Sequence, residues 1–378
     1  MNNVVNEASE KQWRYARLRA EMAKQGIDGL LAYAPAWRRE NVRYLTNAPL
    51  KSKYSFAYLP IEGEATAFVL APEDHEAVRG AGFTEDVRPL SLPGALEVRD
   101  RLADDAKRGR IAIAHQELLP HGVWAALTDG LPADRFHSGT GLMDRMRMVK
   151  SDWELARIRK SGQVCDVAWQ RFVSILRPGV AEYEIVAEVE AGLAEQGAED
   201  NFMLIASGGS DVRGMTSPTD RCLCKGDMVR TEVTPQMDGY WAQICRTAVI
   251  GPPSDNQRKS FDLFEEAVQA GIDAVRPGVT AGEVAAAEND VFRRYGYGEY
   301  CTAEYTRVRG HCLGLHLDEV PLLEGVDTVL EENAVLIVHP NTFTPLAGYH
   351  VLGDPVVVTK AGAKLLLSTP RRLDWVEA

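Results

Sequence analysis

Residues 228–250 read MVRTEVTPQMDGYWAQICRTAVI and contain the clearest predicted β-hairpin in the sequence. Asp238-Gly239 at the centre is typical of a two-residue hairpin turn, and strand-forming residues flank it. The turn sets three pairs of opposite residues: Met237 with Tyr240, Thr234 with Gln243, and Glu232 with Cys245. Opposite residues share one face of a sheet, so we expect one polar face made of Arg230, Glu232, Thr234, Gln243 and Cys245. The pattern by itself favours contact of this face with solvent.

An internal repeat surrounds the hairpin. The tetrapeptide RPGV occurs at 177–180 and again at 276–279. Each copy separates two predicted helices, and each helix pair precedes strand-like sequence, at 228–250 and at 334–359. RPG is common at helix ends, but the shared order of elements favours a duplication. Two similar halves leave a cleft between their sheets, where binding sites are common.

The first part of the chain has a different pattern. A helix is predicted over 9–25, and short strands follow at 29–35, 64–71 and 109–115 with helical stretches between them. This alternation indicates an α/β domain. A long helix predicted over 152–176 belongs to the second part. We therefore predict two domains, residues 1–145 and residues 146–378.

Composition excludes several classes of protein. The chain has 378 residues and a net charge of −12. Residues 1–150 carry 21 basic and 20 acidic side chains. The rest of the chain has 21 basic and 34 acidic side chains, so the net negative charge lies after residue 150. This charge argues against a nucleic-acid partner. Apolar runs stay short of the ~18 residues that a membrane helix needs. The polar first twenty residues lack the apolar core of a signal peptide, so we expect a cytoplasmic protein.

Two further segments carry candidate site residues. Gly310 and Gly314 bracket His311, as a loop requires where its backbone passes close to another group. The segment VLIVHP at 335–340 reads as a buried strand that ends in His339. A single histidine at a strand end is more often structural than functional, so both interpretations stay open on the residues alone. The six cysteines, all after residue 150, are interpreted mostly as small core residues.

Ordered motifs across residues 145–360 resemble the superfamily of creatinase, aminopeptidase P, prolidase and methionine aminopeptidase. In chain order they are RMVKS (147–151) with Glu154, Ile158 and Arg159; ASG (206–208); Gly226-Asp227; Gly239-Tyr240; Arg246-Thr247; Gly310-His311 with Gly314-Leu315; and Val358-Thr359. Each motif is weak alone, but their order and spacing are specific. The resemblance implies an α+β fold, with a C-terminal pita-bread catalytic domain of duplicated αβ halves after a smaller creatinase-like α/β domain.

The same resemblance raises the question of metal ligands. Metallohydrolases of this superfamily hold two metal ions on Asp, Asp, His, Glu and Glu. The matching positions here carry Glu232, Gln243, His311, His339 and Gly353. Two neighbouring ions need several anionic oxygen donors, whereas the second and fourth residues are neutral and the fifth has no side chain. We therefore predict no metal and no other cofactor.

The creatinase branch resembles this pattern more closely, because it has lost the metal ligands and cleaves a C–N bond of a small guanidino compound. This chain departs from creatinase as well. The catalytic histidine position of that branch matches Met215, and the second family histidine matches Asp318, which precedes Glu319. Creatinase-like relatives are homodimers with shared sites, so the resemblance implies a homodimer in which residues 37–41 (WRREN) reach the neighbouring subunit's pocket.

We predict from these groups a metal-independent hydrolase that cleaves a C–N bond of a small nitrogenous compound, an amidine, guanidine or amide, cyclic ones included. The acidic side chains favour a cationic substrate group. Glu232, His311, His339 and Glu319 are the predicted catalytic residues, since Glu and His supply acid–base catalysis when burial shifts their pKa values. The predicted substrate-binding residues are Asp318, Gln243, Thr234, Cys245, Met215, Tyr240 and Arg309.

Three alternatives stay open on the sequence. Glu232, His311 and His339 match the composition of a mononuclear site with two histidines and one carboxylate, in a hydrolase or a lyase. The same acid–base groups suit elimination or ring opening. The chain is alternatively a non-catalytic pita-bread binding protein, as some relatives of this fold are. Nothing in the residues identifies the substrate.

Overall fold

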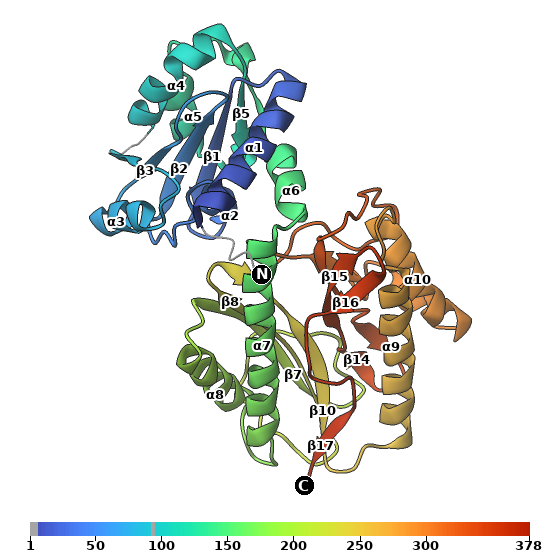
Figure 1. Cartoon of the computed structure of the whole chain (residues 1–378). Helices are drawn as coiled ribbons and strands as arrows, with labels where there is room; N and C mark the ends of the chain where they lie inside the picture. Colours follow the sequence, from blue (N-terminus) through green and yellow to red (C-terminus); the bar gives the residue numbers. More distant parts are fainter. Residues whose placement is uncertain (1–6, 92–94) are drawn as a thin grey trace, which may run out of the picture. The chain divides into compact units, whose positions relative to one another are not determined.

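The computed structural model describes residues 7–91 and 95–378, which form two compact units (Figure 1). The first unit extends to Arg147 and includes Ser151–Trp153, and the second comprises Met148–Lys150 and Glu154–Ala378. The predicted α+β class, with an α/β unit before a duplicated one, is confirmed. None of the helices in the described ranges has the length and apolar character needed to span a membrane.

The first unit is built on a six-stranded sheet in the order β4-β3-β2-β1-β5-β6. Its strands are β1 (Gly29–Pro35), β2 (Tyr54–Pro60), β3 (Thr66–Val69), β4 (Asp86–Pro89), β5 (Ile111–Ala114) and β6 (Phe136–Ser138). Its helices are α1 (Glu7–Gln25), α2 (Glu40–Thr46), α3 (Pro72–Gly80), α4 (Leu96–Arg108), α5 (His121–Thr128) and α6 (Thr140–Met148), with 3-10 turns η1 (Gln116–Leu118) and η2 (Ala133–Arg135). The helix predicted at 9–25 and the strands predicted at 29–35, 64–71 and 109–115 are all present.

The second unit consists of two similar halves. The first half contains α7 (Asp152–Ile175), α8 (Glu182–Glu195), β7 (Asp200–Gly208), β8 (Met228–Met237), β9 (Tyr240–Trp241) and β10 (Ile244–Ile250), with β17 (Asp374–Val376) at the edge of its sheet. The second half contains α9 (Asp255–Ala274), α10 (Ala281–Arg294), η3 (Gly298–Cys301), β11 (Gly310–Cys312), β12 (Val335–Val338), β13 (Thr342–Thr344), β14 (Gly348–His350), β15 (Asp354–Thr359) and β16 (Gly362–Leu365). Its main sheet has the order β11-β12-β15-β16.

The two RPGV turns adopt the same conformation, which supports the predicted duplication. Gly179 and Gly278 have φ angles of 87° and 90°, a region that favours glycine. The Gly179 amide donates to the carbonyl of Leu223 at 2.8 Å, and the Gly278 amide donates to the carbonyl of Leu330 at 2.9 Å. In each half, the glycine amide of the turn is therefore hydrogen-bonded to a later segment of the same half.

The hairpin has the predicted register at both ends. Met237 pairs with Tyr240 and Glu232 pairs with Cys245. Between these pairs the ladder is interrupted, because residues 242–243 belong to no strand. Pro235 has no amide hydrogen to donate at this point, although its carbonyl accepts from the Ala242 amide at 3.3 Å. The predicted pairing of Thr234 with Gln243 is therefore not formed.

The polar face of the hairpin is not in contact with solvent, so that expectation is wrong. Arg230, Thr234, Gln243 and Cys245 are all at most 2% exposed. The second half of the unit packs against this face, as the bridge between Cys245 and Gly353 shows. Buried polar groups need hydrogen-bond partners. Those on this face that have no partner within the protein can bind a ligand, so the face is a candidate binding site.

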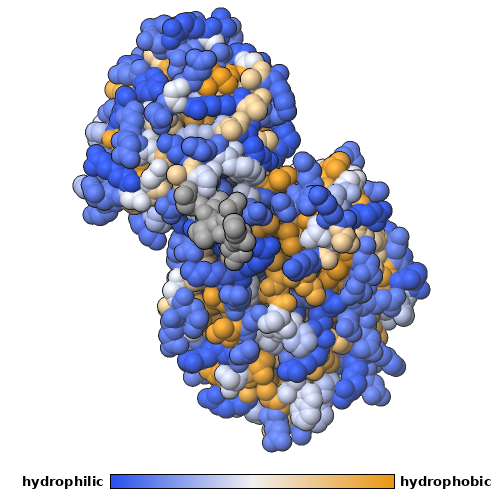
Figure 2. All heavy atoms as spheres, viewed as in Figure 1, coloured by the Kyte–Doolittle hydropathy of each residue, from blue (hydrophilic) through white to orange (hydrophobic). Residues whose placement is uncertain are grey.

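Each half has its own hydrophobic core. One cluster joins α7 and α8 to the sheet of β7, β8 and β10, and the other joins α9 and α10 to the sheet of β12 and β15. Figure 1 shows the two long helices α7 and α9 along the outer sides of these sheets. In Figure 2 hydrophilic residues cover most of the visible surface, and hydrophobic residues gather in patches over the second unit.

His350, on β14, provides a test of this core. Its ring stacks on Phe264 with centroids 4.7 Å apart, and its Nδ1 lies 3.0 Å from Ser260 Oγ. Burial, with a smaller contribution from the charge of Arg230, lowers the pKa of His350 from 6.5 to about 3. The folded state therefore keeps the ring neutral at a pH where the unfolded chain binds a proton.

We predict that the free energy of unfolding falls by about 1.4 kcal/mol per pH unit through His350 as the pH drops from 6.5 towards 3. Denaturant unfolding of the wild type and of His350→Gln, measured between pH 7 and 4, checks this. The variant, whose side chain can still bond to Ser260, should lose that part of the slope. His121→Gln, at an exposed position, is the control and should keep the wild-type slope. Equal slopes in wild type and His350→Gln contradict the prediction.

Candidate active site

A cavity of about 370 Å³ lies in the second unit, on the buried polar face of the hairpin. Its polar lining comprises Glu232, Gln243, Thr306, Arg307, His311, Asp318, His339 and Asn341. Its apolar lining comprises Phe202, Leu204, Met215, Val308 and Leu317, with Tyr349 beside them. Both halves contribute, since β7 and β8 supply one wall and the segments around β11 and after β12 supply the other. Its volume is within the ~300–1,000 Å³ typical of small-molecule sites.

Glu232, on β8, is one of the two carboxyl groups among the described residues that line the cavity. Its Oε1 accepts a hydrogen bond from Asn341 Nδ2 at 2.8 Å. The side chain is partly exposed to the cavity but otherwise surrounded by protein. Burial raises the pKa of Glu232 to about 7, and the Asn341 bond and the charge of Arg307 oppose this rise. Near neutral pH the group can therefore both accept and donate a proton.

His311 and His339 lie side by side across the cavity. Their ring centroids are 5.4 Å apart, with an interplanar angle of 72°. Burial lowers the pKa of both imidazoles, which favours their neutral forms at pH 7. His311 Nδ1 is 3.2 Å from the Cys312 carbonyl oxygen, so it donates there and leaves Nε2 as an acceptor. A Cβ at Gly353 would lie 2.5 Å from the His339 Cβ, so the glycine makes room for this histidine.

Arg307 and Asp318 form an ion pair, with Nη1 and Oδ2 2.9 Å apart. The side chains are 68% and 28% exposed, unlike the buried His311 and His339. The pair therefore lies where the cavity meets solvent. Asp318 was predicted to bind substrate, and its carboxylate does line the cavity, but an arginine already holds it.

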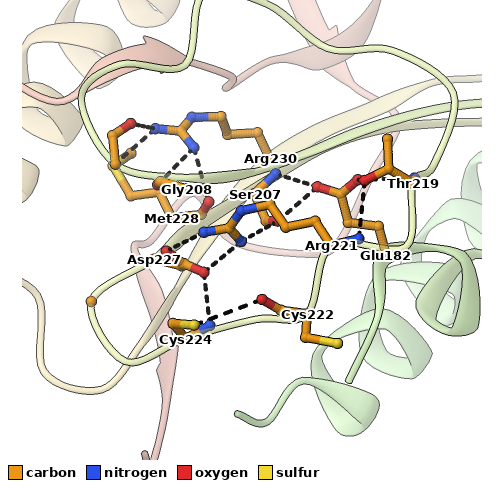
Figure 3. Close-up of polar contacts among 12 residues, drawn as sticks. Glu182, Ser207, Gly208, Thr219, Arg221, Cys222, Cys224, Asp227, Met228 and Arg230 are labelled. Carbon is orange, nitrogen blue, oxygen red and sulfur yellow. Dashed lines mark hydrogen bonds and ion pairs between the residues drawn. The ribbon is translucent and has the colours of Figure 1, made fainter. Parts of the chain in front are cut away.

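Met215, predicted to bind substrate, lines the cavity, and a hydrogen-bond network fixes the segment that carries it (Figure 3). Glu182 Oε1 accepts from the Ser207 amide and hydroxyl, both at 2.7 Å, while its Oε2 accepts from Thr219 Oγ1 at 2.7 Å. Arg221 Nη1 is 2.7 Å from Asp227 Oδ2. Both ends of the segment are therefore tied to α8, β7 and β8.

Three predicted site residues with polar side chains do not line the cavity. Each makes a buried structural contact instead. Glu319, predicted to be catalytic, has its Oε2 3.1 Å from Lys150 Nζ, with both side chains at most 5% exposed. The Arg309 guanidinium donates to Asn289 Oδ1 at 2.5 Å and to the Pro340 carbonyl at 2.9 Å. The Tyr240 hydroxyl donates to Glu154 Oε1 at 3.0 Å. These groups were predicted to contact substrate, but each is occupied by a buried partner.

Thr234 and Cys245 also lie outside the cavity lining. Both are fully buried, and Thr234 Oγ1 has no hydrogen-bond partner in the described part of the chain. Burial raises the pKa of the Cys245 thiol well above its usual range, and the charge of Glu232 adds to this rise. The thiol therefore stays protonated, and neither residue lines the cavity in which they were predicted to bind substrate.

Sequence reasoning missed Arg307, Asn341 and Tyr349 among the lining residues. Asn341 follows His339 by two residues, just after β12 ends, where side chains commonly reach a site. Arg307 precedes His311 by four residues, in an irregular segment with no periodicity to indicate its direction. The available signal was their position in the sequence, because Arg307 and Asn341 are polar residues within four positions of the two histidines.

Comparison with known proteins extends these observations. The chain is 26% identical over 355 residues to an Xaa-Pro dipeptidase of Pyrococcus horikoshii, covering 93% of this chain and 96% of the relative. It is 32% identical over 237 residues to a probable dipeptidase, PepE, of Mycobacterium tuberculosis, covering 62% of each. The structure matches an Xaa-Pro dipeptidase from Bacillus anthracis with a TM-score of 0.84 at 25% identity, over 97% of this chain and 100% of the other.

Two family models also match. The model of metallopeptidase family M24 matches residues 156–360, and the creatinase/prolidase N-terminal domain model matches residues 14–149. These findings contradict two predictions, a metal-independent hydrolase of non-peptide C–N bonds and the absence of any cofactor. The resemblance to creatinase was given too much weight, because the loss of metal ligands is a local feature, whereas the full-length relatives are dipeptidases.

The donors in this cavity do not fit the two-metal centre of the superfamily. At the five matching positions the chain provides one carboxylate, one amide, two imidazoles and a glycine. Within residues 7–91 and 95–378, no group of three or more His, Cys, Asp or Glu side chains is placed to hold a metal ion. Family membership and this donor set therefore disagree, and we assign no chemical step here to a metal.

The assignment of the chain rests on the fold and on the length of the matches. Its second unit has the duplicated halves of the pita-bread fold, and the first unit has the smaller α/β sheet that the resemblance implied. The M24 match covers more than half of the chain. The chain therefore belongs to metallopeptidase family M24, with a creatinase/prolidase N-terminal domain.

Proposed function

We propose that this chain hydrolyses the peptide bond of a small peptide held in the cavity of its second unit. Membership of a peptidase family and the similarity to Xaa-Pro dipeptidases support this substrate class. The observation that carries the proposal is the position of Glu232, which faces the same cavity as the imidazoles of His311 and His339. Peptide hydrolysis needs a group that takes a proton from water and one that returns a proton to the leaving nitrogen.

Glu232 is the candidate for moving the proton. Among the described residues that line the cavity, it is the carboxyl group without a basic side chain as ion-pair partner, since Asp318 is held by Arg307. Asn341 orients the carboxyl group through Oε1, and the Cys245 thiol also contacts it. His311 presents Nε2 as a hydrogen-bond acceptor for a substrate amide.

The apolar wall of the cavity supports a peptide with apolar side chains. Phe202, Leu204, Met215 and Leu317 line the cavity together with the polar groups, and Leu204 on β7 is the cross-strand neighbour of Glu232. Burial of a proline ring or an aliphatic side chain against this wall is favourable by the hydrophobic effect. Dipeptides of the Xaa-Pro type, which the relatives' names state, are therefore the first substrates to test.

We predict measurable release of amino acids from a panel of Xaa-Pro and other dipeptides, assayed with Mn²⁺, Co²⁺ or Zn²⁺ added and with a chelator. Glu232→Gln should lower kcat/KM by about 100-fold or more, because the amide cannot exchange a proton. Its melting temperature should stay near that of the wild type, since Gln can still accept from Asn341. Mass spectrometry of the products measures the turnover.

Glu195→Gln, at the exposed end of α8, is the matched control and should keep full activity. Two outcomes count against the proposal. One is a complete absence of peptide hydrolysis under every metal condition. The other is full activity of Glu232→Gln on a peptide that the wild type cleaves, which would remove this carboxyl group from the mechanism.

We also propose that the chain forms a homodimer through the region of Trp37. The Trp37 side chain is 74% exposed, which is unusual for such a large apolar group. The neighbouring Glu40 and Asn41 are buried within their own unit, where Glu40 binds Arg38 at 2.6 Å and Asn41 binds Arg147. Of residues 37–41, Trp37 is therefore best placed to contact a second copy.

Light scattering coupled to size exclusion should give twice the chain mass of 41.7 kDa. Trp37→Ser should shift the equilibrium towards the monomer, since it removes a large apolar contact from the interface. Trp375→Ser, a substitution of another half-exposed tryptophan, serves as the control and should leave the mass unchanged. A monomeric wild type at micromolar concentration contradicts the proposal.

A further inference from the structure

Strand β7 forms one edge of the sheet in the first half of the second unit, because the strand order there is β17-β10-β8-β7. Two residues of this strand, Phe202 and Leu204, line the cavity, and Leu204 is the cross-strand neighbour of Glu232. Phe202 is also 40% exposed, so its ring lies where the cavity opens to solvent. The edge of a sheet beside a cavity offers backbone groups as well as side chains to a ligand.

Among the described residues, the outer side of β7 is paired at Ile205. This residue exchanges two backbone hydrogen bonds with Thr216, of 3.1 and 3.2 Å. Along an antiparallel strand, successive residues direct their backbone groups alternately to one neighbouring strand and to the other. The register with β8 is unbroken from 200 to 208, so Met203 also directs its N–H and C=O outward. No other segment of residues 7–91 and 95–378 forms a hydrogen bond to these two groups.

Pro218 gives the reason why the outer pairing ends. Continuing the antiparallel bridge at Thr216 by two residues would place Pro218 opposite Met203. Proline has no N–H to donate to the Met203 carbonyl, and it is rare inside a ladder for that reason. The chain instead bends at Ser217. This segment therefore leaves the edge of β7 open over residues 200–204, which is the part of the strand that contributes to the cavity.

We propose that this open edge of β7 binds the main chain of an extended peptide by strand addition, so that peptides longer than a dipeptide bind more tightly. The inference rests on the proposed peptidase function and deepens it, because it names as substrate an extended peptide with residues beyond the cavity. One peptide residue exchanges two backbone hydrogen bonds with Met203, as Thr216 does with Ile205. The exposed ring of Phe202 packs against a neighbouring side chain of the peptide.

The test measures binding separately from turnover, in the Glu232→Gln background. Isothermal titration calorimetry compares Leu-Pro with two tetrapeptides, Leu-Pro-Leu-Ala and Ala-Leu-Leu-Pro, which extend it at either end. One tetrapeptide should bind about tenfold more tightly than the dipeptide, because it adds a pair of backbone hydrogen bonds. N-methylation of one of its two leucine or alanine amides should remove this gain. N-methylation of the adjacent amide, whose N–H points away from β7, should leave the gain intact.

The protein side of the same contact is tested at Met203. Met203→Pro removes the outward N–H and keeps the ladder to β8, since proline is tolerated where the N–H of an edge strand faces outward. This variant should lower the ratio of the tetrapeptide and dipeptide affinities to about one, because the proline ring also blocks the approach of a strand. Met203→Ala, which shortens the side chain but keeps the amide, is the matched control and should keep the parent ratio.

Three outcomes overturn the proposal: no gain in affinity for either tetrapeptide, an equal effect of N-methylation at both amides, or the parent ratio in Met203→Pro. A second copy of the chain seated on this edge gives the first of these outcomes. If Met203→Pro does not fold, the N-methylated peptides alone decide. Failure of the proposed function is distinguishable, because the tetrapeptide would then bind with this pattern while the wild type cleaves no peptide.

Discussion

The cavity of the second unit depends on a buried ion pair between its two halves. Arg246, on β10, lies 2.5 Å from Asp354, the first residue of β15, and neither side chain is more than 3% exposed. Arg246 also donates to the Gly353 carbonyl at 2.7 Å, next to the bridge between Cys245 and Gly353. Loss of one partner of such a pair costs about 3–5 kcal/mol, because the other charge stays buried. The contact holds β10 and β15 together, so Glu232 on β8 faces His339 after β12.

A second buried arginine, Arg230 on β8, also joins the two halves of the unit. Arg230 donates to the carbonyls of Gly208 and Gly209 at 3.1 Å and of Ala347 at 2.9 Å, and it also contacts the carbonyl of Tyr349 (Figure 3). Burial lowers its pKa to about 10, which still leaves it charged at neutral pH. These bonds bring Tyr349 to the cavity. Arg230 and Arg246 thus join the two halves, and neither of them lines the cavity.

Four of the five positions that the resemblance assigns to the family's metal ligands line this cavity, and they carry different donors here. The metal ligands of the superfamily are mostly carboxylates. This cavity is lined instead by Glu232, two imidazoles and an arginine paired with Asp318. Gly353 and His339 are coupled in this respect, since a side chain at position 353 would collide with the histidine. A Cβ at 353 would also lie 2.6 Å from the Val338 carbonyl oxygen, so a carboxylate at this position requires a shift of the backbone. Family membership accounts for the fold, whereas the ligand depends on the residues that line the cavity.

The sequence by itself determined the elements, the repeat and the family. The turn at Asp238-Gly239 set the register of Glu232 opposite Cys245, because hairpin pairing follows from local backbone geometry. Only the tertiary structure decided which polar groups face the cavity. Glu319 and Arg309 share their segment with His311, yet Lys150 and Asn289 occupy them, while Arg307 lines the cavity. Residues distant in the sequence determine which groups face the cavity. A buried charge needs a partner, and folding decides which residue lies close enough to pair with it.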